Sequence, residues 1–124
     1  MRQQKQRPPR DSHAYVIVVP ESGSAYLERM DDSVRAVCRK VIGANHVDVI
    51  PCGMDSRFYI VYSVETAESD GYNRPASRLA QEWLRGPCVV VRGDNPHKIR
   101  GFSRPGALKV LGELAEMIGG ADDV

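Results

Sequence analysis

The residues whose types could perform nucleophilic chemistry are a cysteine, a histidine and an aspartate near the middle of the chain. His46, Asp48 and Cys52 stand at positions of the same parity, so on one extended strand their side chains would face the same side. A thiol becomes a nucleophile when a histidine within ~3 Å can take its proton. Unless the chain folds back after Pro51, however, His46 and Cys52 would lie ~20 Å apart. A core cysteine and a surface histidine are the better interpretation, and we predict no catalytic residue and a non-enzymatic protein.

A second candidate site lies at the predicted start of a helix that follows residue 72. Asn73 is a suitable N-cap, and the free N–H groups at a helix start attract anions. Arg74 and Arg78 would add positive charge one turn apart, and Tyr72 could stack on a base or another planar group. These four residues are our predicted site for a small anionic, nucleotide-like ligand. Because Pro75 removes one donor, a plain N-cap flanked by solvated arginines remains the alternative interpretation.

Basic residues elsewhere in the chain indicate a third possibility, nucleic-acid binding. Residues 1–10 carry four basic groups and no acidic one, and such an arm would contact phosphates. Phe102 is a possible stacking group for a base. The residues that would extend this basic surface are Arg92, Lys98, Arg100 and Arg104. Residues 11–124 sum to −3 and hold no recognised docking motif, so we keep nucleic-acid binding as the alternative function.

The three cysteines indicate reduced thiols. Cys38, Cys52 and Cys88 are odd in number, widely spaced and set in apolar surroundings, which favours packing in a core over disulfide bonding. A Cys and His metal site would need closely spaced ligand pairs, and the histidines supply none. We therefore predict no metal and no cofactor.

Composition and charge limit the class of protein. At 124 residues, 42% hydrophobic and 27% charged, the chain is typical of one globular domain. Its longest apolar runs are far shorter than the ~20 residues that span a bilayer, so we expect a cytoplasmic protein. The net charge of +1 hides an asymmetry: residues 11–73 hold five basic and ten acidic groups, whereas residues 74–104 hold seven and two. Such a field would steer anionic ligands, although a surface of self-complementary charges is the alternative.

Hydrophobic patterns predict strands in pairs with single helices between them. Three helices are expected: one from an Asp31 or Asp32 cap to Gly43, one over 74–85 with Trp83 on its apolar face, and one from Ser103 to Gly119-Gly120. The expected strands are 14–19, 25–29, 46–51, 57–64, 88–92 and 98–102. This order predicts an α+β fold with a mixed, largely antiparallel sheet covered by about three helices. A single domain of residues 13–120 would lie between a disordered basic arm (1–12) and an acidic frayed tail (121–124).

Several of these segments together resemble a family of proteins from phages and bacterial mobile elements, called domain of unknown function 3846. The similar segments are 37–43 (VCRKVIG), 46–51 (HVDVIP), 58–62 (FYIVY), 73–76 (NRPA) and 86–93 (GPCVVVRG). The resemblance covers about residues 14–102. It implies an accessory protein of phage or mobile-element origin, and it implies no catalytic residue.

Our leading hypothesis from the sequence is a small binding protein. Its partner would be a host or viral protein, or a small anionic ligand. Oligomeric state and partner identity are left open.

Overall fold

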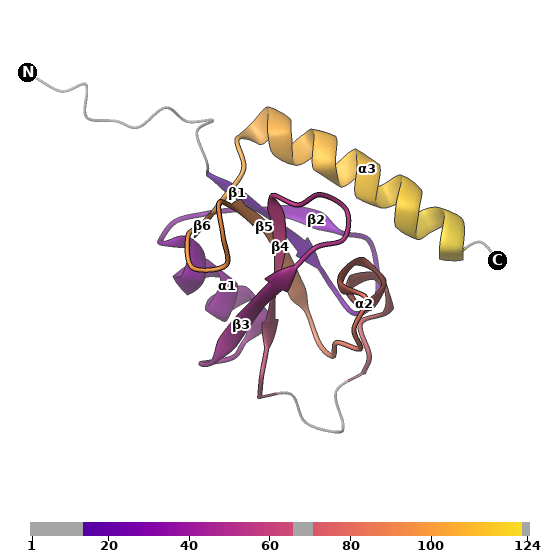
Figure 1. Ribbon diagram of the computed structural model, residues 1–124, viewed down its shortest axis with the longest axis horizontal. Helices are drawn as coiled ribbons and strands as arrows, with labels where there is room; N and C mark the ends of the chain where they lie inside the picture. Colours follow the sequence, from indigo (N-terminus) through magenta and orange to yellow (C-terminus); the bar gives the residue numbers. More distant parts are fainter. Residues whose placement is uncertain (1–13, 66–70, 123–124) are drawn as a thin grey trace, which may run out of the picture.

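The computed structural model describes residues 14–65 and 71–122, which form an α+β fold in a single domain (Figure 1). The helices are α1 (Val34–Ile42), α2 (Arg74–Ala80) and α3 (Arg104–Asp122). The strands are β1 (Tyr15–Val19), β2 (Tyr26–Arg29), β3 (Val47–Pro51), β4 (Phe58–Ser63), β5 (Cys88–Gly93) and β6 (Ile99–Arg100). The predicted fold class is confirmed. The predicted basic arm lies outside the described residues.

All strand pairings in the described sheet are antiparallel. The strand order is β2-β1-β5-β4-β3, and β6 pairs with β5 outside this path. One edge of β5 pairs with β4, and the other edge pairs first with β1 and then with β6. This central position explains why β5 is a nearly continuous β-branched run, since both of its faces are covered.

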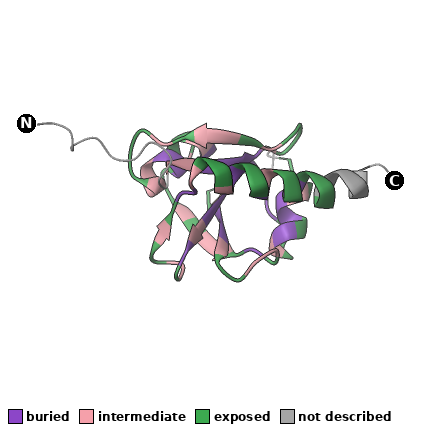
Figure 2. Cartoon of the chain, turned by 90° about the horizontal axis from the view of Figure 1, so that it is seen from above, coloured by how far each residue is buried: buried purple, intermediate pink, exposed green. Residues whose placement is uncertain are grey.

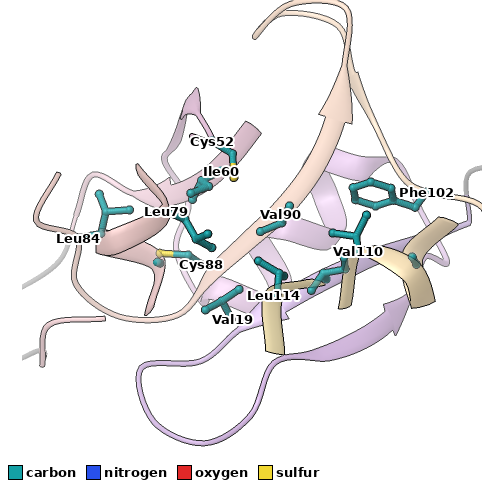
Figure 3. Close-up of a cluster of buried hydrophobic side chains, with 13 residues drawn as sticks. Val19, Cys52, Ile60, Leu79, Leu84, Cys88, Val90, Phe102, Val110 and Leu114 are labelled. Carbon is teal, nitrogen blue, oxygen red and sulfur yellow. The ribbon is translucent and has the colours of Figure 1, made fainter. Parts of the chain in front are cut away.

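The sheet separates two hydrophobic clusters, because successive side chains along each strand alternate between its faces. Val89 and Val91 of β5 face α1, where they meet Val37 and Cys38. Val90 faces the opposite side, in a cluster with Leu79 of α2 and Leu114 of α3 (Figure 3). The molecule is therefore a three-layer arrangement, with α1 on one face and α2 and α3 on the other. Seen from above, α3 crosses the molecule with its outer side largely exposed (Figure 2).

The ends of α1 follow the usual capping chemistry. Ser33, and not Asp31 or Asp32, is the N-cap, because its hydroxyl accepts a hydrogen bond from the Ala36 N–H at 3.2 Å. At the other end Gly43 adopts a left-handed conformation with φ 78°, as its position after the last apolar residue predicted.

The other two helices differ in length from the sequence-based prediction. Helix α2 ends at Ala80, five residues before Arg85, because Gln81 turns into the left-handed region with φ 59°. Helix α3 continues to Asp122, past the two glycines at which we expected it to end. The early end of α2 changes the direction in which the side chains of residues 81–85 point.

Candidate functional site

A short ladder of backbone hydrogen bonds brackets α2 and positions the candidate site. The Asn73 N–H donates to the Leu84 carbonyl at 2.8 Å, the Gly86 N–H donates to the Gly71 carbonyl at 3.0 Å, and Tyr72 and Arg85 form an antiparallel bridge. Residues on either side of α2 therefore behave as paired strands. Their side chains alternate, which sends some of them into the core and the others into solvent.

Asn73 is the inward-facing polar residue of this ladder and is completely buried. Its Oδ1 accepts from the Ala76 N–H at 3.0 Å, and its Nδ2 donates to the carbonyls of Val19 and Gly86 at 2.8 and 2.9 Å. The predicted N-cap is thus confirmed, but the side chain is occupied by the protein itself. With Pro75 lacking an N–H and the Ala76 N–H already bonded, the start of α2 keeps little capacity for an anion.

Trp83 is exposed, which contradicts its predicted place on the apolar face of a longer helix. Its exposed fraction is 76%, whereas the next residue, Leu84, is 4% exposed and belongs to the core cluster with α2. The physical reason is the change of period after Ala80: strand-like alternation replaces the helical spacing that would have turned Trp83 inward. The Ser77 hydroxyl holds Leu84 in place by accepting a hydrogen bond from its N–H at 2.8 Å.

The outward-facing side chains form a row, which we call the Trp83 surface: Tyr72, Trp83 and Arg85, with Arg74 and Arg78. The rings of Tyr72 and Trp83 lie 5.2 Å apart, and the Arg85 guanidinium covers the Tyr72 ring at 4.1 Å. Tyr72, which we expected to stack on a ligand, is therefore already occupied on one face. The free aromatic surface at this site belongs to Trp83.

Trp83 also lines a hollow of about 320 Å³ beside α2. Arg74 and Arg78 line the same hollow, together with Ser77, Gln81 and Glu82. Of the four predicted ligand-binding residues, Arg74 and Arg78 line one hollow with the Trp83 ring, Tyr72 contacts that ring outside the lining, and Asn73 is buried. The signal for Trp83 was that it is the only tryptophan in the chain.

The four residues of the nucleic-acid alternative fall into two groups. Arg92 and Arg100 line a second hollow of about 210 Å³ between the β5–β6 hairpin and α3, whereas Lys98 and Arg104 do not line it. Two cations that the sequence did not single out, Arg57 and Lys109, also line it, as does the carboxylate of Asp94. We refer to Arg57, Arg92, Arg100 and Lys109, with the rings of Phe58 and Phe102, as the Arg92 pocket.

Cys52 and His46 occupy different environments at opposite ends of β3. Cys52 is 3% exposed, and burial raises the pKa of its thiol. The His46 ring is exposed, with Nδ1 2.5 Å from a carboxylate oxygen of Glu65. This hydrogen bond lowers the pKa of the Glu65 carboxyl. The two side chains predicted to be apart are therefore apart.

Burial also governs the other two cysteines, and the expectation of core thiols is confirmed. Cys38 and Cys88 are free and fully buried on opposite faces of the sheet, and burial raises the pKa of each thiol to about 12. Within residues 14–65 and 71–122, no three His, Cys, Asp or Glu side chains gather as metal ligands would. No helix in the described part of the chain has the length and hydropathy needed to cross a membrane.

Comparison of the chain with protein-family models, with curated proteins and with solved structures found no match.

Proposed function

We propose that this protein is a small binding protein and that the Trp83 surface takes a planar anionic ligand of the nucleotide type. The observation that carries the proposal is the combination of a tryptophan that is 76% exposed with two arginines on one hollow. Leaving so much of an indole in water forgoes about 2 kcal/mol or more of burial free energy. Exposed aromatic and arginine side chains are the types that binding surfaces favour.

The chemistry of the surface matches a nucleotide in two parts. The free face of Trp83 offers a stacking partner for a base, since base-aromatic stacking contributes about 1–3 kcal/mol. Arg74 and Arg78, both exposed and one helical turn apart, offer guanidinium donors for a phosphate. Glu82, in the same lining, adds one carboxylate that would repel a second phosphate.

The direct test is a fluorescence titration, because Trp83 is the only tryptophan and reports on the site itself. Titration with AMP should quench its emission, with adenosine binding more weakly than AMP because it lacks the phosphate. N-acetyltryptophanamide at equal absorbance corrects for light absorbed by the nucleotide. Arg78→Gln should weaken AMP binding about tenfold, the loss expected for one charge-assisted hydrogen bond.

Arg39→Gln is the matched control, since Arg39 is an exposed arginine of α1 on the other side of the sheet. It removes the same charge and should leave the AMP titration unchanged. Absence of quenching by any nucleotide would refute the proposal. So would an equal loss of affinity in the Arg78 and Arg39 variants, because that result would reflect net charge alone.

Nucleic-acid binding is the second candidate, and the observation in its favour is that Arg92 and Arg100 come together in one pocket. Recognition of a host or viral protein through the same Trp83 surface would show as nucleotide-independent complex formation. A phage or mobile-element origin is part of this proposal; it rests only on the resemblance drawn from the sequence of residues 14–102, and no family model matches the chain.

A further inference from the structure

The Arg92 pocket is built on a row of side chains that crosses three strands. Phe58 of β4, Arg92 of β5 and Arg100 of β6 stand opposite one another in the sheet register. Arg92 follows Val90 by two positions, so it lies on the face that α2 and α3 cover. Lys109 of α3 and Phe102 close the pocket from that side.

The hairpin that carries Arg100 is tightly defined. A side chain at Gly93 would approach the Lys98 carbonyl to 2.5 Å, so the turn requires glycine there. The His97 N–H donates to the Asn95 side chain at 2.8 Å, and the Lys98 N–H donates to the Asn95 carbonyl at 3.0 Å. These bonds place Arg100 directly across from Arg92.

Two arginines directly opposite each other on paired strands destabilise a sheet unless a counter-charge lies between them. Within residues 14–65 and 71–122, the ion-pair partner of Arg100 is the exposed Asp94, at 3.7 Å, and Arg57 is bonded to Asp55 at 3.2 Å through two nitrogens. Arg92 is half-buried, and among the described residues no carboxylate forms an ion pair with it or with Lys109. The pocket therefore concentrates four cations around a hollow whose lining holds one carboxylate, that of Asp94.

We propose that the Arg92 pocket binds a phosphate group, independently of the Trp83 surface. Arg92 and Arg100 would bracket its oxygens with guanidinium donors from neighbouring strands, and Lys109 would add a third positive charge from α3. The two rings, whose centroids lie 5.3 Å apart, form an apolar wall that strengthens these charge interactions by excluding water. The phosphate belongs either to a small phosphate ester or to a nucleic-acid backbone.

Calorimetric titration of the full chain with pyrophosphate at low salt tests whether the pocket binds a small phosphate-bearing molecule. Fluorescence anisotropy with a labelled single-stranded oligonucleotide tests whether it binds a nucleic-acid backbone. We expect Arg92→Gln to weaken whichever ligand binds at least about tenfold. In the absence of ligand the same variant should be as stable as the wild type or more stable, because the cross-strand repulsion is relieved. Lys109→Gln, an exposed change on α3, provides a second variant that leaves the sheet intact.

Arg39→Gln is again the control, because Arg39 is exposed on α1, on the face of the sheet opposite the pocket. Binding of pyrophosphate that depends on Arg92 and Lys109 but not on Arg39 supports a small phosphate-bearing molecule as the ligand. Oligonucleotide binding with the same dependence and a steep loss with salt supports a nucleic-acid backbone. Binding of neither ligand, or equal losses in all three variants, would overturn the proposal. The AMP titration of Trp83 is a separate measurement, so either site can fail without the other.

Discussion

At the scale of single residues, Asn73 shows how one buried side chain joins three parts of the chain. Its amide group caps α2, reaches the end of β1 at Val19 and ties down Gly86 before β5. An amide is the group that can supply one acceptor and two donors at once. The polar residue that the sequence marks as part of a binding site is thus the residue that holds the ladder beneath the Trp83 surface.

Replacing this amide should therefore cost more than removing an ordinary helix cap. We expect Asn73→Ala to lower the free energy of unfolding by about 3 kcal/mol or more, since it leaves the Ala76 N–H without its acceptor and removes the amide donors to the carbonyls of Val19 and Gly86. Ser33→Ala, which removes the single exposed cap bond of α1, should cost about 1 kcal/mol. Urea unfolding followed by circular dichroism measures both. Equal losses in the two variants would show that the bonds to Val19 and Gly86 contribute nothing.

At the scale of elements, the end of α2 decides which apolar side chain is buried. Gln81 terminates the helix, and the paired segments after it turn Leu84 inward and Trp83 outward. The site thus depends on a helix that ends one turn earlier than its apolar spacing suggests.

Substitution of these neighbours should consequently have opposite effects. Leu84→Ala should lower the free energy of unfolding by about 2–5 kcal/mol, the range for truncating a buried leucine. Trp83→Ala should change it by no more than about 0.5 kcal/mol, as at other exposed positions, yet it should abolish nucleotide binding. Thermal or urea unfolding beside isothermal titration with AMP separates the two quantities. A large loss of stability in the Trp83 variant would indicate that this ring packs in the core after all.

At the scale of the whole molecule, one sheet separates two hydrophobic clusters, and each cluster contains at least one cysteine. Cys38 belongs to α1 and packs between that helix and the sheet, whereas Cys52 and Cys88 lie on the face covered by α2 and α3. The thiolate is the reactive form, and burial disfavours it at all three positions.

Alkylation of the thiols should therefore report on opening of each layer. In the native protein at pH 8 we expect labelling by iodoacetamide to be at least ~100-fold slower than in denaturant. If the shared sheet makes the domain one cooperative unit, all three cysteines should become reactive at the same urea concentration. Peptide mass spectrometry after pulsed labelling resolves them individually. Earlier labelling of Cys38 would show that the α1 layer opens by itself.

The sequence predicted the fold class and most of the elements, whereas it did not predict which side chains come together at the candidate sites, for physical reasons. Strand β5 and helix α1 follow from local patterns, because a β-branched run and an apolar stripe each admit few arrangements. The turn at Gln81 has no signal in the local sequence, because glutamine is uncommon in the left-handed region. Moreover, a helix that buries Trp83 and a strand-like segment that buries Leu84 fit the sequence equally well. Arg57 and Lys109 stand 52 positions apart in the chain, so only the tertiary fold reveals that they share a pocket.

The exposure of Trp83 also determines how folding can be observed in this protein. An indole that already lies in water emits at long wavelength in the native state, so unfolding leaves the colour of its emission nearly unchanged. The two phenylalanines and five tyrosines elsewhere in the chain offer a weaker optical signal. The emission wavelength of Trp83 will thus report ligand binding at the Trp83 surface but will change little when the domain unfolds. Circular dichroism or thiol protection must measure unfolding instead.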